Sequence, residues 1–175
     1  MIKFRNDILT ELIMNKIGIY QISFGLIKIG SKIEDIDITE INEIYVLHPL
    51  IKTNNFENLD YTIRERLELL KEYNGYIHLA GGLSCSIKNQ TIEDLRIYKL
   101  YMEKVKHFTR EEIISFHGIP DYELEDITPF SSKVNNIILS YETKRINFYI
   151  DPKESTLKEI YTGKIDKSKF KLHEK

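Results

Sequence analysis

The sequence contains one cysteine, Cys85, and no tryptophan. A single cysteine excludes a disulfide within the chain, and it also excludes a CxxC redox pair and a zinc site built from several thiolates. Disulfides are typical of oxidising compartments, so their exclusion favours a reducing one. We therefore expect a cytoplasmic protein.

Long apolar runs are also missing. The N-terminal stretch MIKFRNDILTELIMNKIG is interrupted by Asp7, Thr10 and Glu11, so it has neither the continuous apolar core nor the small-residue cleavage site of a signal peptide. Nowhere does an apolar run approach the roughly 20 residues that cross a bilayer. The sequence therefore predicts no membrane partner.

Alanine occurs once, at Ala80, whereas isoleucine occurs 29 times. A β-branched residue suits the pleated surface of a sheet, so this composition favours strands, although an AT-rich coding genome gives the same bias. A chain of 175 residues suffices for one domain with a real core. We predict an α+β fold, in which short helices pack on one face of an antiparallel β-sheet.

The net charge of −2 gives no global attraction to nucleic acid or to an anionic membrane. Two runs are nevertheless acidic without a base: EDIDITEINE at 34–43 and DYELED at 121–126. A solvated face is one interpretation of such runs, and a docking surface for a basic partner is the other. The docking hypothesis selects seven partner-binding residues: Glu34, Asp35, Asp37, Asp121, Tyr122, Glu123 and Asp126.

Periodicity predicts the elements of the first half. We expect a helix over 3–15, strand-bend-strand over 17–29, a helical turn capped by Ser31 and an extended segment over 41–50. After a polar loop over 51–60, Thr62 and Glu65 form a capping box for a helix that Gly75 terminates. Three strands should follow, with the sequences YIHLA, LSCSI and DLRIYKLYM.

The stretch HFTREEIISFHGIPD at 107–121 predicts a second short helix. Thr109 and Glu112 form another capping box, and Gly118 followed by Pro120 ends the helix. An acidic turn and three more strands should follow, with the sequences NNIILSY, INFYI and TLKEIYT. The order of a helix and a three-stranded meander thus occurs twice, at 62–102 and 109–165. We predict a single domain over 1–175, with an internal repeat over 1–104 and 105–175 as an open alternative.

Thr109, Glu112, Ile113, Gly118 and Pro120 carry a resemblance. Their pattern is similar to the helix and Gly-x-Pro turn in repeats of the β-lactamase-inhibitor-protein-like group and the related small outer-membrane assembly lipoproteins. The resemblance covers 105–165 and, more faintly, 30–102. It implies helices on one face of a curved antiparallel sheet whose other face binds protein. The chain lacks the secretion signal and lipid-attachment cysteine of those families, so neither an envelope location nor lactamase inhibition carries over.

Candidate catalytic chemistry is sparse. His107, His117 and Asp121 are the best metal-like set, but the helix cap between the histidines does not give the i, i+4 face of zinc helices. We expect His117 instead to meet the carbonyls at the helix end as a partly protonated imidazole. Cys85 and His78 lie on adjacent predicted strands, yet no positive group stabilises a thiolate there. Gly81-Gly82 lacks the spacing of a phosphate-binding loop.

A binding function therefore ranks first. We expect a non-enzymatic protein that neutralises or regulates a protein partner, as immunity proteins neutralise toxins, and the partner would be a basic toxin domain. We expect no cofactor, no metal and no nucleic acid, and the oligomeric state stays open. The alternative is a small hydrolase, or a metal-dependent nuclease, that uses the acidic and histidine side chains of 107–126.

Overall fold

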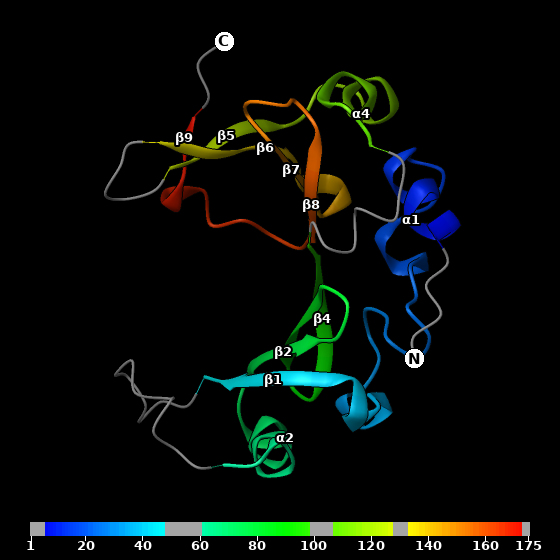
Figure 1. Cartoon of the computed structure of the whole chain (residues 1–175), viewed down its shortest axis with the longest axis vertical. Coiled ribbons are helices and arrows are strands. Elements are labelled where there is room, and N and C mark those ends of the chain that lie inside the picture. The colour runs from blue at the N-terminus through cyan, green and yellow to red at the C-terminus, as the bar shows by residue number, and fades with distance from the viewer. Residues whose placement is uncertain (1–5, 48–60, 99–106, 128–132, 173–175) are drawn as a thin grey trace. The chain divides into compact units, whose positions relative to one another are not determined.

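The computed structural model of the chain describes residues 6–47, 61–98, 107–127 and 133–172. These residues form two compact units. The first unit is Ser23–Leu95, and the second combines residues 6–22 with the chain from Arg96 onward. Figure 1 shows the order of their helices and strands. In the described part of the chain, no helix has the length and apolarity that a membrane crossing needs.

The first unit is a helix packed on antiparallel strands. Its elements are η2 (Ile33–Asp35), η3 (Ile38–Glu40), β1 (Ile41–Val46), α2 (Ile63–Glu72), β2 (Gly75–Leu79), β3 (Leu83–Lys88) and most of β4 (Thr91–Ile97). Helix α2 lies against β1 and β2, where Leu70 is buried (Figure 1). Ile44 and Ile77 are cross-strand partners and are fully buried. These apolar side chains form the core of the unit, as burial of one sheet face requires.

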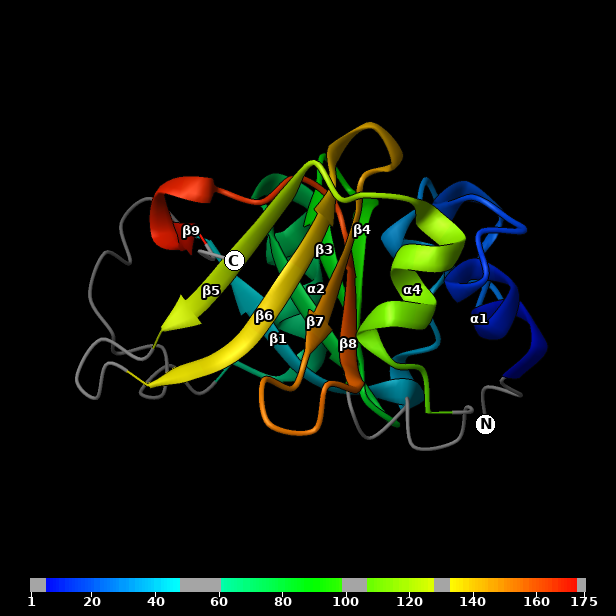
Figure 2. The ribbon, with the colours of Figure 1, turned by 90° about the horizontal axis from the view of Figure 1, so that it is seen from above.

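The second unit contains two helices and the remaining strands. Its elements are α1 (Asn6–Ile13), η1 (Ile19–Gln21), α4 (Arg110–His117), β5 (Tyr122–Ile127), β6 (Val134–Tyr141), η5 (Glu142–Lys144), β7 (Ile146–Ile150), β8 (Leu157–Thr162), η6 (Lys167–Lys169) and β9 (Lys171–Leu172). Figure 2 shows α1 beside α4. The ring of His117 on α4 packs edge-on against Phe148 of β7, at 4.8 Å between centroids. Helix α4 therefore covers the face of the strands that carries Phe148.

Within the first unit the described strands follow the order β1-β2-β3-β4, and within the second unit the end of β4 is followed by β8-β7-β6-β5-β9. Their recorded pairings are antiparallel. Strand β4 passes from the first unit into the second, where Arg96 and Ile97 pair with β8. The predicted α+β class, with short helices and an antiparallel sheet, is confirmed. A helix followed by antiparallel strands occurs in each unit, but common descent of the two stays a prediction.

Both predicted capping boxes are present. Thr62 Oγ1 accepts from the Glu65 amide at 3.3 Å, while Glu65 Oε2 accepts from the Thr62 amide at 2.7 Å. At α4 the Glu112 amide donates to Thr109 Oγ1 at 3.2 Å, and the Thr109 amide donates to Glu112 Oε2 at 2.9 Å. Each box satisfies amides that have no partner within the helix. The local pattern was therefore sufficient to place these two helix starts.

Helix α1 ends in a Schellman motif that determines the path of the next segment. Asn15 takes a left-handed φ of 57°, and its amide donates to the Leu12 carbonyl at 3.0 Å. The Lys16 amide donates to the Glu11 carbonyl at 2.8 Å, which completes the six-to-one bond of the motif. The predicted helix over 3–15 thus ends earlier, at Ile13, and its first residues lie outside the described ones.

Three local predictions were wrong. The helical turn over 32–36 is capped by Lys32, whose amide donates to the Asp35 carboxylate, whereas the Ser31 hydroxyl donates to the Leu26 carbonyl. Residues 17–29 form η1 and an isolated bridge between Phe24 and Ile27 in place of two strands. Helix α2 is terminated by its C-cap residue Tyr73 and not by Gly75, which is the first residue of β2.

Gly75 is required by close packing. A Cβ atom there would lie 2.1 Å from the main-chain oxygen of Tyr45 and 2.5 Å from Leu70. The helix and the neighbouring strand therefore approach the backbone at this position more closely than any side chain allows.

The acidic turn predicted over 121–126 is also wrong, because Tyr122–Ile127 is strand β5, paired with β6 and β9. The other predicted strands correspond to β1 to β4 and β6 to β8. The loop predicted over 51–60 and the end of the strand predicted over 94–102 lie outside the described residues.

Candidate functional site

The first acidic run lies on two short turns that precede β1. Glu34 and Asp35 belong to η2 and are exposed, and Asp37 is the exposed N-cap of η3. Asp37 Oδ1 accepts from the Thr39 amide at 2.9 Å and from the Thr39 hydroxyl at 2.7 Å. These hydrogen bonds hold the pKa of Asp37 below its usual range, so this carboxylate is ionised at neutral pH.

A tight turn brings apolar side chains to the same place. The Phe24 amide donates to the Ile27 carbonyl at 2.8 Å, and the Ile27 amide donates back at 3.1 Å. Gly25 supplies the left-handed conformation of this turn, with φ at 66°, and Leu26 at its tip is 72% exposed. So exposed a leucine is available for contact with another molecule.

Together the two segments form a hollow of about 170 Å³. We call it the acidic hollow, and its lining residues are Phe24, Gly25, Leu26, Ile27, Asp35, Asp37 and Glu40. Three acidic residues and three apolar residues thus line the same hollow, and the lining contains no basic residue. Lysine and arginine combine an aliphatic stem with a cationic head, so either side chain matches the two surfaces.

Of the predicted partner-binding residues, Asp35 and Asp37 line the acidic hollow, and Glu34 is their exposed neighbour, 3.6 Å from Lys32. The predicted set did not include Glu40 or Leu26. Glu40 belongs to the same acidic run, so its charge was the available signal. Leu26 had only the preceding glycine as a signal of an exposed turn.

The second acidic run has a different structure from the first. As β5 is a strand, successive side chains alternate between its faces. Glu123 binds Arg110 of α4 at 2.7 Å, and its side chain is only 7% exposed. Tyr122 packs against the cluster of Leu124, Ile138 and Tyr149, with the Lys167 ammonium 3.8 Å from its ring centroid. These side chains are largely occupied by contacts within the unit.

The other two acids that the docking hypothesis selects from this run also have internal partners. Asp121 is exposed, and its carboxylate accepts from the Glu142 amide at 2.7 Å. Asp126 is half-buried and accepts from the side-chain amide of Asn136 at 2.8 Å. Tyr122, Glu123 and Asp126 are therefore less available than the acids of the first run, whereas Asp121 is exposed and bound to one amide, as Asp37 is.

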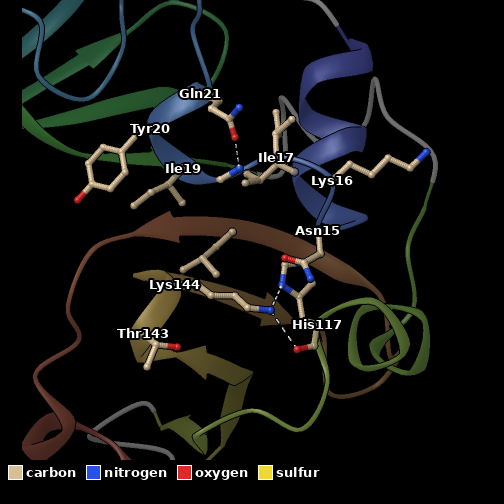
Figure 3. Close-up of a pocket in the computed structure, with 12 residues that line it drawn as sticks. Asn15, Lys16, Ile17, Ile19, Tyr20, Gln21, His117, Thr143 and Lys144 are labelled. Atoms are coloured by element: carbon tan, nitrogen blue, oxygen red, sulfur yellow. Dashed lines mark hydrogen bonds between the residues drawn. The ribbon is translucent and has the colours of Figure 1, made fainter.

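His117 is neutral. Burial, and secondly the charge of Lys144, lower its pKa to about 4. Its Nε2 lies 2.9 Å from the Ile13 carbonyl oxygen and its Nδ1 lies 3.5 Å from the Lys144 ammonium (Figure 3). These partners require the Nε2–H tautomer, since a carbonyl accepts and an ammonium donates. The predicted protonated imidazole at the helix end was therefore wrong.

The helix end is instead closed by Lys144, which donates to the His117 carbonyl at 3.1 Å. A cation at this position interacts favourably with the free carbonyls of α4. Lys144 was missed by sequence reasoning because its only signal was a place in the polar turn Glu142-Thr-Lys.

The remaining candidate groups are separated. Cys85 pairs with Ile77 while His78 pairs with Ser84, so cysteine and histidine point to opposite faces. Burial raises the pKa of Cys85 to about 12, as expected of a buried thiol without a cation. His107 is exposed and precedes the cap of α4. Within the described ranges, no three histidine, cysteine or acidic side chains come together as metal ligands would.

An exposed aromatic pair lies on the face of the first unit opposite α2. Tyr45 and Tyr76 are cross-strand partners and are 39% and 44% exposed. The Tyr45 ring also meets His78 edge-on, at 5.3 Å between centroids. Tyrosines are favoured anchors in protein interfaces, so this pair is compatible with a binding surface.

No protein-family model matches the chain, and neither a curated protein nor a solved structure matches it. The resemblance to β-lactamase-inhibitor-like repeats therefore stays a prediction.

Proposed function

We propose that this chain is a binding protein that regulates or neutralises a protein partner with a basic surface. The acidic hollow is the observation that carries the proposal. Its carboxylates Asp35 and Asp37 are exposed and held in place by main-chain amides, and Leu26 presents an apolar surface beside them. A lysine or arginine of the partner would place its stem on Leu26 and its charge among the carboxylates.

The charge of this surface favours rapid association with a basic partner. The run 34–43 contains five acids and no base, so its field attracts a basic partner before contact. Exposed charges accelerate encounter more than they strengthen the bound state, whereas the buried apolar contact slows dissociation. The hollow combines exposed charges and an apolar surface at one place. Rapid capture of a basic partner is the behaviour that suits a neutralising protein.

In its specific form, the proposal is that the chain acts in the cytoplasm as an immunity protein and that a basic toxin domain is the partner. In this proposal the interface comprises Glu34, Asp35 and Asp37, and we add Glu40 and Leu26 because they line the same hollow. The proposal does not require the predicted residues of the second run, Asp121, Tyr122, Glu123 and Asp126, since their side chains have partners within the second unit.

The test is differential capture from the native cell. Three baits are compared: the parent, a hollow variant Asp35→Asn/Asp37→Asn/Glu40→Gln, and a control variant Glu68→Gln/Glu72→Gln. The control removes two exposed acids from α2, which does not line the hollow. We expect one protein with a basic surface to be captured by the parent and the control and lost with the hollow variant. Equal capture by all three baits would refute the proposal.

The alternative of a hydrolase or metal-dependent nuclease in 107–126 has no comparable support. Its acids and histidine have different partners: Arg110 for Glu123, Asn136 for Asp126, and the Ile13 carbonyl for His117. These contacts direct the three side chains to different partners, so they do not converge on one place where a substrate or a metal could bind.

A further inference from the structure

The second unit contains a pocket of about 370 Å³ that the proposed function does not use. It lies between the segment after α1, the end of α4 and the turn η5 (Figure 3). Leu12, Ile17, Ile19 and Ile146 give it an apolar wall. Its volume falls at the lower end of the range of about 300–1,000 Å³ that is usual for small-molecule sites.

The pocket is electropositive. Its twelve lining residues include Lys16 and Lys144 but no aspartate or glutamate. The side chain of Lys16 extends away from Lys144 (Figure 3), so Lys144 is the cation inside. The neighbouring Arg145 donates to the hydroxyl of Tyr20, another lining residue, at 3.3 Å.

The contacts described for the Lys144 ammonium are all with neutral groups. It donates to the His117 carbonyl at 3.1 Å, approaches His117 Nδ1 at 3.5 Å and lies 5.4 Å from the centroid of the Tyr141 ring. An ammonium group has three hydrogens, so one remains for a further acceptor. No salt bridge joins this ammonium to a carboxylate of the described residues. A half-buried charge is costly without a counter-ion, and an anion at this position would offset that cost.

We propose that this pocket binds a small organic carboxylate. The carboxylate accepts from Lys144, and the hydrocarbon part lies against Ile17, Ile19 and Ile146. A single inward cation with an apolar wall suits a monoanion with a hydrocarbon tail better than it suits inorganic phosphate, which carries more charge and no apolar surface.

This inference is independent of the acidic hollow, since every lining residue of the pocket belongs to the second unit and every lining residue of the hollow belongs to the first. Failure of one proposal therefore leaves the other unaffected.

The experiment is an NMR titration of the whole labelled chain at pH 7 with hexanoate, with hexanamide as its neutral counterpart and with inorganic phosphate. We expect saturable shifts of the amide signals of Gly18, Ile19 and Lys144 with hexanoate, and at least tenfold weaker binding of the other two probes. Lys144→Met should weaken hexanoate binding at least tenfold. The control Lys153→Met, at an exposed turn, should bind like the parent.

Three results would overturn the proposal. Hexanoate could give no saturable shift, hexanamide could bind as tightly as hexanoate, or Lys144→Met could bind as tightly as the parent. If Lys144→Met does not fold, the comparison of hexanoate with hexanamide on the parent decides alone, because those probes differ only in the group that meets Lys144.

Discussion

The Lys144 ammonium donates to the carbonyl oxygen of His117, the last residue of α4, at 3.1 Å. The same ammonium also approaches the ring of that histidine, at 3.5 Å from Nδ1. One lysine thus provides the positive charge at the end of the helix and, together with burial, holds the imidazole neutral. The sequence suggested that His117 would provide the positive charge at the helix end. In the structure Lys144 provides that charge, and His117 stays neutral.

The first prediction concerns the pKa of His117. An NMR pH titration of the parent should give a value of about 4, because burial and Lys144 both disfavour the imidazolium. Lys144→Met should raise the pKa, yet leave it below 6.5, because burial is the larger cause and remains. Lys153→Met should leave it unchanged. An unshifted pKa in Lys144→Met would show that the ammonium does not act on the ring.

The second prediction follows by linkage. The pKa of His117 is 6.5 in the unfolded chain and about 4 in the folded chain. The folded state therefore favours the neutral ring, and its contribution to stability is complete above pH 6.5. This contribution is lost as the pH falls towards 4, because the unfolded chain then binds a proton that the folded chain does not. The groups around the ring are Ile13 on α1, Lys144 on η5, Tyr141 on β6 and Phe148 on β7. Burial raises the pKa of Tyr141 to about 12, so it does not titrate in this window.

The measurement for this second prediction is urea unfolding of the parent and of His117→Gln at several values between pH 4 and 7. Both proteins lose stability from other titrating groups, and these cancel in the difference. The parent should lose more free energy of unfolding than the variant as the pH falls. Parallel pH profiles would contradict the neutral imidazole.

The third prediction tests the start of α4. Thr109→Ala removes the acceptor of the Glu112 amide and should lower the free energy of unfolding by about 1 kcal/mol. Ser115→Ala in the middle of the same helix is the control: its exposed hydroxyl donates to the Glu112 carbonyl at 2.7 Å but takes no part in the capping box, and alanine favours the helix. Denaturant unfolding measures both. If Ser115→Ala lowered the free energy of unfolding as much as Thr109→Ala, the capping box would have no stabilising effect of its own.

The fourth prediction uses the close approach at Gly75. Gly75→Ala should destabilise the chain by about 2–3 kcal/mol, because the new Cβ meets the Tyr45 oxygen and Leu70. Gly18→Ala is the matched control: apart from its chain neighbours, its Cβ would meet nothing nearer than the side-chain oxygen of Gln21, at 3.8 Å, and its φ of −90° suits any residue. Thermal unfolding of both variants distinguishes overpacking from a general effect of alanine.

The sequence predicted correctly those elements that depend on interactions between residues close together in the chain. The capping boxes at Thr62 and Thr109 depend on two side chains three residues apart, and the segment INFYI predicts β7 from β-branched and aromatic residues alone. Strand β5 was not recognised because half of its six residues, YELEDI, are acids, which are depleted in strands. Its pairing with β6, which gives Asp126 a partner in Asn136, depends on a strand that comes later in the chain.

The sites depended on contacts between distant residues. His117 meets the Ile13 carbonyl across 104 residues of sequence and Lys144 across 27, so no spacing rule could have predicted the pocket. The acidic hollow was partly predictable, because Asp35 and Asp37 stand in one acidic run. Its apolar wall was not, since the turn at Gly25 had to fold back to place Leu26 beside that run.

The most direct test of the central claim is the association rate between the chain and the basic partner captured with it, measured from low to physiological ionic strength. The hollow variant Asp35→Asn/Asp37→Asn/Glu40→Gln should associate several-fold more slowly than the parent and depend less on salt, while Glu68→Gln/Glu72→Gln should behave like the parent. Association rates of the hollow variant equal to those of the parent at every ionic strength would contradict a docking role for the acidic hollow.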